Sequence, residues 1–321
     1  MLVYLSRFFV VILLFSTLLL LYILHKNTTK TPTIKIGTNF WHGYEILYLA
    51  RKLGYLPDGV KLVEYNTTSE VKRAYRNGLI NAMALTLDEA LRLLAEGYQV
   101  RVIMVFDVSD GADVVIAKED IKTPKDLKGK IIGVEKTALG AYMLQRFLEK
   151  NGLKPEDVEV RVLELHEHYE AFLEGKVDAV ITFEPEKSKI LRKGGRVIFS
   201  SKDIPDEIVD VLVVDVSLLK QEEVLRELIK AYFRAYDYYE NNEEKAYNLM
   251  ADRLGLSPDE FAESVEGMKL PNLVHNREML KSGTLRRSID MVCHVMKLYN
   301  MLPKEVDCGG LLDEKVVNKL Y

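Results

Sequence analysis

Cysteine is scarce in this chain of 321 residues, which contains two, Cys293 and Cys308. Neither follows directly on the apolar run near the N-terminus, so attachment of a lipid to a cysteine at that point is excluded. Two cysteines outside the cytoplasm can form a disulfide. Their spacing leaves the bridged and the free forms open, and a bridge would have a structural role only.

Basic residues are not in excess either. The 44 basic and 48 acidic side chains give a net charge of −4. The first thirty residues contain three basic and no acidic side chains, so the remainder has 41 basic against 48 acidic and a net charge of −7. This mildly acidic body argues against a nucleic-acid-binding protein. The length is sufficient for two domains, and 48% hydrophobic residues is normal for a soluble globular protein.

Acidic residues are absent from the N-terminal segment, where a run of 17 residues, 8–24, is interrupted only by Ser16 and Thr17. Arg7 precedes the run, and the pattern is typical of a secretory signal or a short membrane anchor. The A-x-A pattern that usually marks cleavage is missing, which favours an uncleaved anchor over a cleaved signal. Positive charge tends to stay in the cytoplasm, so we expect the body to be extracytoplasmic and residues 1–30 to be anchor and linker.

The stretch 34–56 shows where a ligand could bind. A short apolar strand leads into the turn Trp41-His42-Gly43-Tyr44-Glu45, and a helix follows. Such a turn joins the carboxyl end of a strand to the amino end of a helix, where open α/β sheets bind small ligands. No nucleophile, metal cluster or phosphate loop accompanies it, which favours a binding protein over a catalyst.

The rest of the body alternates strand and helix signals, which predicts an α/β fold with a mainly parallel sheet. The predicted strands are 34–37, 60–65, 80–85, 100–106, 114–117, 131–134, 158–165, 179–183, 196–199 and 209–216. The predicted helices before the tail include 44–53, 69–75, 87–96, 123–127, 138–150 and 169–174. Residues 220–321 have an almost wholly helical pattern.

Two such α/β units suggest a particular domain arrangement. If the chain crosses between them near 107–113 and returns near 208–214, the two segments form a hinge with a ligand cleft between the lobes. We therefore predict one lobe from residues 31–108 with 214–321, and a second from residues 109–213. The helical tail would pack on the first lobe.

Six short motifs occur in a characteristic order along the chain. They are WHGYE at 41–45, LTLDE at 85–89, DVSDGAD at 107–113, GVE at 133–135 with ALGA at 138–141, VITFEP at 180–185 and EIVD at 207–210. Over residues 34–219 this order resembles the periplasmic substrate-binding proteins of ABC importers, in the branch of the nitrate, sulfonate and taurine binders and the thiamine-pyrimidine binders. The resemblance implies a type II periplasmic-binding-protein fold: two lobes with mixed sheets, which close on a ligand and deliver it to an ABC permease in the membrane.

The motifs supply the candidate site. The aromatic rings of the turn can stack on a planar or cationic ligand, with about 0.5–2 kcal/mol for a cation over a ring. Glu184 ends a strongly apolar strand, where a carboxylate has little structural reason to be, so it is the first candidate for a polar anchor. Core packing for the aromatics and helix capping for the polar residues stay open as alternatives. The predicted ligand-binding residues are Trp41, Tyr44, Glu45, Thr86, Asp88, Asp110, Asp113, Glu135, Leu139, Thr182, Glu184 and Asp210.

Many of these candidates are carboxylates, and this predicts the charge of the ligand. Buried carboxylates without a partner are costly or take up protons, and a ligand that is positive or donates hydrogen bonds removes that penalty. Glu135 would also repel an anion at the junction 137–140. We therefore expect an amine-bearing or amidine-like ligand, such as an aminopyrimidine, rather than nitrate or a sulfonate.

Other patterns support different chemistry less well. His166 and His168 would share one face of a strand, as in some metal sites, but no further ligand set is recognisable, so we expect a solvated strand end and predict no metal or cofactor. The pyrimidine synthases of thiamine synthesis resemble the same fold but carry a CCCFC motif that is missing here. A membrane-held ligand-sensing subunit is a further alternative. The leading hypothesis is an extracytoplasmic solute-binding protein that is not an enzyme.

Overall fold

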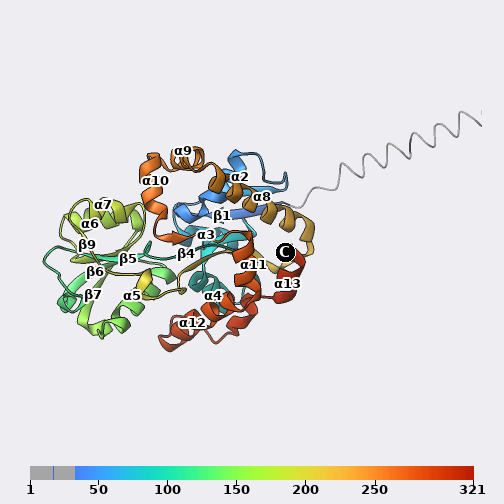
Figure 1. The fold of residues 1–321 in the computed structure, drawn as a ribbon. Helices are drawn as coiled ribbons and strands as arrows, with labels where there is room; N and C mark the ends of the chain where they lie inside the picture. The colour runs from blue at the N-terminus through green and yellow to red at the C-terminus, as the bar shows by residue number, and fades with distance from the viewer. Residues whose placement is uncertain (1–16, 18–32) are drawn as a thin grey trace, which may run out of the picture. The chain divides into compact units, whose positions relative to one another are not determined.

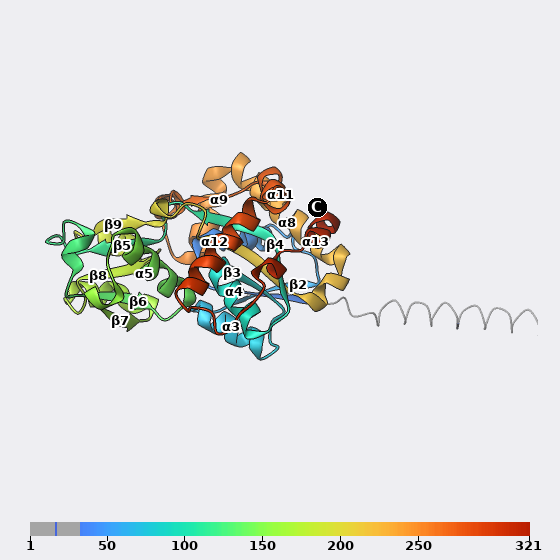
Figure 2. The ribbon, with the colours of Figure 1, turned by 90° about the horizontal axis from the view of Figure 1, so that it is seen from below.

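The computed structural model describes residue 17 and residues 33–321. The predicted anchor and its linker, residues 1–30, lie outside the described residues apart from Thr17, and their roles stay predictions. Within the described residues, no helix is both long enough and apolar enough to cross a bilayer. Residues Ile34–Tyr321 form one compact unit, which contains two β-sheets (Figures 1 and 2).

The first sheet has six strands in the order β11-β4-β10-β3-β1-β2. Its strands are β1 (Ile34–Thr38), β2 (Val60–Glu64), β3 (Ala82–Thr86), β4 (Val100–Ser109), β10 (Val209–Asp215) and β11 (Met268–Lys269). β1 pairs in parallel with β2 and β3, whereas β10 is antiparallel to both β3 and β4. The alternation of strand and helix predicted a mainly parallel sheet. β10 differs because it brings the chain back from the second sheet, beside the strand by which the chain left.

The second sheet has five strands in the order β7-β6-β8-β5-β9. These strands are β5 (Val114–Ala117), β6 (Lys130–Glu135), β7 (Val158–Leu163), β8 (Ala179–Thr182) and β9 (Arg196–Ser200). β6 is parallel to β7 and β8, and β5 is antiparallel to β8 and β9. Residues 110–113 and 201–208 pass between the two sheets. The division into an α/β fold with two mixed sheets agrees with the prediction, and the residue limits of the two lobes stay a prediction.

Helices cover both faces of each sheet. The helices are α2 (Glu45–Lys52), α3 (Thr68–Arg76), α4 (Leu87–Glu96), α5 (Ala138–Lys150), α6 (His168–Leu173), α7 (Glu186–Leu191), α8 (Glu222–Asn241), α9 (Glu243–Leu254), α10 (Pro258–Val265), α11 (Leu273–Lys281), α12 (Thr284–Leu298) and α13 (Glu314–Leu320). Short 3-10 helices include η1 (His42–Tyr44), η4 (Leu165–Glu167) and η7 (Cys308–Leu311). In Figure 1, α6 and α7 lie on one side of the second sheet and α5 on the other.

The side-chain alternation of the central strands explains the layers of the first sheet. On β3, Ala82 and Ala84 pack in the core that contains α2 and α8, while Met83 and Leu85 pack in the core that contains α3, α4 and α12. Successive side chains of a strand point to opposite faces, so a fully apolar strand serves both cores. The helical tail therefore supplies α8 to one face and α12 to the other, where α12 contacts α4 (Figure 2).

The two cysteines form a disulfide between α12 and η7. Cys293 and Cys308 are 15 residues apart, with a Cα–Cα distance of 6.3 Å. The structure thus selects the bridged form from the two that the spacing left open. A bridge that closes a loop of this length stabilises a fold by about 3 kcal/mol in the chain-entropy model, so its role is to hold the tail together.

Candidate functional site

A cavity lies where the ends of strands from both sheets meet. It encloses about 390 Å³ of space not filled by atoms, part of which is open to solvent. The lining residues are Asn39, Trp41, Tyr44, Thr68, Thr86, Glu89, Asp113, Glu135, Thr137, Leu139, Phe183 and Asp210. Most of them lie at or just after the carboxyl ends of β1, β3, β6 and β8, or in the first turns of α3, α4 and α5. Open α/β sheets bind ligands at this edge.

The cavity brings together seven of the predicted site residues. They are Trp41, Tyr44, Thr86, Asp113, Glu135, Leu139 and Asp210. They come from both sheets and from a span of 170 residues, so the proximity arises from the fold and not from adjacency in the sequence. Their role in binding a ligand stays a prediction.

Trp41 links the first sheet to the second across the cavity. Its indole Nε1 donates a hydrogen bond of 3.0 Å to Oδ2 of Asp107 in β4. The indole ring packs edge to face against Phe183, which follows β8, with ring centroids 5.6 Å apart. Phe183 is part of the motif VITFEP but was not among the predicted site residues, although an aromatic residue at the end of a buried strand was a usable signal.

Asp210 and Asp107 are a pair of opposed carboxylates. They face each other in the ladder between β10 and β4, and both are buried. The hydroxyl of Tyr44 donates a hydrogen bond to Asp210, while Oδ1 of Asp107 has no hydrogen-bond partner among the described residues. Burial raises the pKa of Asp107 to about 7, and the nearby Asp113 adds to the increase. Burial, with Asp107 as the next cause, raises the pKa of Asp210 well above its usual value.

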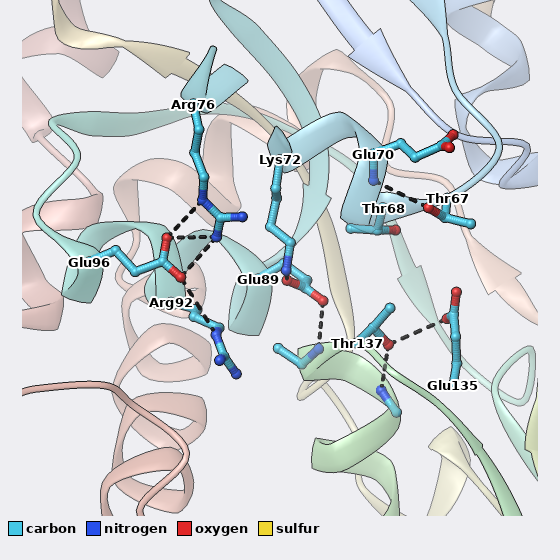
Figure 3. Close-up of polar contacts among 12 residues, drawn as sticks. Thr67, Thr68, Glu70, Lys72, Arg76, Glu89, Arg92, Glu96, Glu135 and Thr137 are labelled. Carbon is cyan, nitrogen blue, oxygen red and sulfur yellow. Dashed lines mark hydrogen bonds and ion pairs between the residues drawn. The ribbon is translucent and has the colours of Figure 1, made fainter. Parts of the chain in front are cut away.

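Two further carboxylates line the cavity, Asp113 in the segment between the two sheets and Glu135 at the end of β6. Burial raises the pKa of Asp113 to about 6. The pKa of Glu135 rises to about 7 because the side chain is buried and Glu89 is close. The hydroxyl of Thr137 donates a hydrogen bond of 3.3 Å to Glu135 (Figure 3).

The lining residues, all within the described part of the chain, therefore include four carboxylates, at positions 89, 113, 135 and 210, and no Lys or Arg. Burial is the largest cause of the raised pKa of Asp113, Glu135 and Asp210, and the charges of Lys187 and Lys72 offset only part of it for Asp113 and Glu135. A ligand that supplies a cation or hydrogen-bond donors would restore the charged forms.

Five predicted site residues lie outside this cavity, and two of them form ion pairs with residues far away along the chain. Glu45 in α2 accepts hydrogen bonds of 2.9 Å at both oxygens from Nε of Arg253, which belongs to α9. Asp110 forms an ion pair of 3.2 Å with Lys269 in β11. The sequence could not show either partner, because each lies more than 150 residues away along the chain.

The other three have local or buried partners. Glu184 accepts hydrogen bonds from the Ser188 hydroxyl at 2.9 Å and from its backbone N–H at 3.2 Å, so it stabilises the start of α7, the capping alternative. Thr182 contacts Nδ1 of the buried His168 at 3.0 Å. Asp88 is buried beside Glu89, and its Oδ2 has no hydrogen-bond partner in the part of the chain that the structure describes. Burial and then Glu89 raise the pKa of Asp88 to about 7.

The expectation for the histidine pair was wrong. β7 ends at Leu163, so neither histidine lies on a strand: His166 belongs to η4 and His168 begins α6. His168 is fully buried rather than solvated. Within the described residues, no group of three or more His, Cys, Asp or Glu side chains is arranged to hold a metal ion.

Several lining residues were not selected from the sequence. Asn39, Thr68, Glu89 and Thr137 all lie at junctions between a strand and a helix. Glu89 was part of the quoted motif LTLDE, but Asp88 was chosen in its place. The two residues point differently because they are neighbours on a helix, where successive side chains are about 100° apart.

Comparisons with known proteins identify the family and the fold of this chain. A family model described as NMT1/THI5 like matches residues 42–246. A curated relative from Brucella abortus (strain 2308), named "Putative binding protein", is 34% identical over 122 residues, which are 35% of this chain and 38% of the relative. The chain therefore matches well under half of the length of that relative.

Solved structures share the fold over nearly the whole chain. The periplasmic aliphatic sulphonate binding protein SsuA from Escherichia coli superposes with a TM-score of 0.72 at 20% identity, over 88% of this chain and 92% of SsuA. The desulfurization enzyme DSZB superposes with a TM-score of 0.67 at 17% identity, over 90% of this chain and 98% of the enzyme. The predicted periplasmic-binding-protein fold is confirmed, and DSZB demonstrates that an enzyme can have it too.

Proposed function

This chain belongs to the NMT1/THI5-like family, and from that premise we propose that it is a solute-binding protein that captures a small ligand in the cavity and delivers it to an ABC permease. The position of the cavity between the two sheets supports a site that opens and closes. None of the lining residues, all described, is a Cys, His, Ser or Lys, which favours binding over catalysis.

One observation carries the proposal for the ligand: four carboxylates line the cavity, and its lining residues, all of them described, include no Lys or Arg. Glu89 is paired with Lys72, whereas Asp113, Glu135 and Asp210 have raised pKa values. Buried charge without a partner costs several kcal/mol, so the site favours a ligand that brings amine or amidine N–H groups. The same charges oppose a sulfonate or a nitrate ion.

The aromatic walls of the cavity indicate a planar ligand. Trp41 and Phe183 line the cavity and offer flat apolar surface. A planar ring with exocyclic amines, such as an aminopyrimidine, would use both the aromatic and the acidic walls. We propose that Trp41, Tyr44, Asp113, Glu135 and Asp210 contact it.

Isothermal titration of the full chain with three probes tests this proposal. We expect an aminomethyl-substituted aminopyrimidine to bind, and propane-1-sulfonate and nitrate to give no heat of binding. Tighter binding of the sulfonate than of the amine would contradict the proposed ligand class. Native mass spectrometry of the purified protein would identify a ligand that remains bound.

We also propose that the protein acts outside the cytoplasm and is anchored by residues 8–24. The apolar run after Arg7 supports this, as does the name of SsuA, a periplasmic protein with the same fold. Mass spectrometry of the mature N-terminus tests the anchor. A mature chain that begins near Thr31 would contradict it.

A further inference from the structure

Glu89 makes a contact across the cavity that the proposed function does not require. It is in the first turn of α4, beside the first sheet, and its Oε1 accepts a hydrogen bond of 2.7 Å from the backbone N–H of Ala138. Ala138 is the first residue of α5, which packs on the second sheet. A carboxylate from one side of the cavity therefore sits on the amino end of a helix from the other side.

The second oxygen of this carboxylate also has a partner. Nζ of Lys72 in α3 donates a hydrogen bond to Oε2 of Glu89, and both side chains are buried (Figure 3). Glu89 thus has an ammonium on one oxygen and a helix N–H on the other. These are the contacts that a bound anionic group would make.

The amino end of α5 is suited to an anion. It is a helix of 13 residues, and the N–H groups of the first turn together with the helix dipole favour negative charge there. Thr137 caps the helix by accepting a hydrogen bond of 3.0 Å from the N–H of Gly140, so the N–H of Ala138 is the donor that points to Glu89. Glu89, Thr137 and Leu139 all line the cavity, so this contact forms part of its wall.

We propose that Glu89 is a specificity-determining residue, an internal anion that occupies the position at the start of α5 where an anionic group of a ligand would otherwise bind. This inference rests on the proposed solute-binding function and deepens it. Because Lys72 neutralises Glu89, the contact adds no net charge to the site. The cavity therefore keeps its acidic wall for the positive end of the ligand, and this place for a negative group is already filled.

Substitution of Glu89 by alanine tests the proposal. Glu89→Ala vacates the position and leaves both the ammonium of Lys72 and the N–H of Ala138 without their partner. We expect propane-1-sulfonate to bind to this variant of the full chain and not to the wild type, as measured by isothermal titration. Glu89→Gln is the matched control, because its amide fills the same space and keeps an acceptor for Ala138. It should still exclude the sulfonate.

A double variant separates the contribution of the ammonium from that of the vacated space. Lys72→Ala/Glu89→Ala should bind the sulfonate about ten- to a hundredfold more weakly than Glu89→Ala, the range for one charge-assisted hydrogen bond. Amide hydrogen exchange at residues 137–140 supplies a readout that does not depend on the cavity's own ligand. It should be faster in Glu89→Ala than in the wild type, and the sulfonate should slow it again. If the alanine variant does not fold, Glu89→Ser serves the same test.

The outcomes distinguish this inference from the proposed function. A folded Glu89→Ala with faster exchange at Ala138 and no affinity for the sulfonate would overturn the inference alone. Equal affinity of wild type and variant for the sulfonate would overturn it as well. If the variant gains affinity for the sulfonate but the wild type fails to bind the aminopyrimidine, the inference stands and the proposed ligand class is wrong.

Discussion

Two groups of buried carboxylates in this molecule differ in whether a cation accompanies them. Glu207 accepts hydrogen bonds of 2.7 Å at each oxygen from Arg146 in α5 and one of 2.6 Å from the hydroxyl of Tyr142. At the cavity, Asp210, which lines it, lies opposite Asp107. Among the described residues neither carboxylate forms an ion pair, and one oxygen of Asp107 has no hydrogen-bond partner. Both groups are almost fully buried, so burial alone does not mark a site. The lack of a cationic partner marks the site, because a carboxylate without such a partner is stabilised when a ligand supplies a cation or hydrogen-bond donors.

The largest expected effect on stability comes from breaking the ion pair between Glu207 and Arg146. Glu207→Ala leaves the guanidinium of Arg146 buried without its bidentate partner, and we expect the free energy of unfolding to fall by about 3–5 kcal/mol. Urea denaturation measures this loss. Glu156→Ala, at an exposed ion pair with Lys154, is the control and should change it by no more than about 0.5 kcal/mol. Equal effects of the two substitutions would remove the contrast between buried and exposed pairs.

The affinity for the aminopyrimidine should depend on the charge of Asp210, which lines the cavity, and not on the charge of Glu207, which is paired with Arg146. Asp210→Asn keeps an acceptor for Tyr44 but removes the charge, so binding of the aminopyrimidine should weaken by about ten- to a hundredfold. Glu207→Gln is the matched neutralisation outside the cavity and should leave the affinity unchanged. Isothermal titration of both variants checks this. Undiminished binding to Asp210→Asn would show that the acidic wall does not select the ligand.

The stability of the ligand-free protein should fall as the pH rises. The folded-state pKa of Asp113 is raised to about 6 and those of Asp107 and Glu135 to about 7. A carboxyl whose pKa is raised by folding contributes its full stability at pH values below its unfolded-state pKa, which is near 4. This stability is lost as the pH rises through the folded-state pKa. Chemical denaturation at intervals between about pH 4 and pH 8 should record a loss of at least a few kcal/mol, because each unit of pKa increase corresponds to about 1.4 kcal/mol. A saturating amine ligand should reduce this loss, and a flat profile without ligand would contradict the raised values.

The smallest expected effect is a gain, rather than a loss, of stability. Asp107→Asn removes a buried charge but keeps an acceptor for Trp41, so at pH 8 the ligand-free protein should gain about 1 kcal/mol of stability. Thermal unfolding at pH 8 and at pH 5 measures the gain, which should be smaller at pH 5, where the wild-type carboxyl is protonated. A loss of stability at both pH values would mean that Asp107 is a structural residue like Glu207.

The elements of the fold were predictable where their signals are local. The limits predicted for α4, α5 and β5 match the observed ones, because apolar periodicity and the Thr137 cap depend on residues that are close together in the sequence. The histidine pair was misplaced because β7 ends earlier than its alternating pattern suggested and η4 follows. Burial of His168 against Thr182 depends on the packing of α6 on β8, which no local pattern shows.

The sequence by itself determined the alternation of strands and helices, the acidic character of the body and the junctions where polar side chains follow buried strands. These depend on periodicity, composition and capping, which act over a few residues. Only the tertiary structure decided which carboxylates face the cavity. It pairs Glu45 with Arg253 and Glu89 with Lys72, and it leaves Asp210 opposite Asp107. The physical reason is that the charge state of a buried group depends on its neighbours in space, which the fold brings from distant parts of the chain.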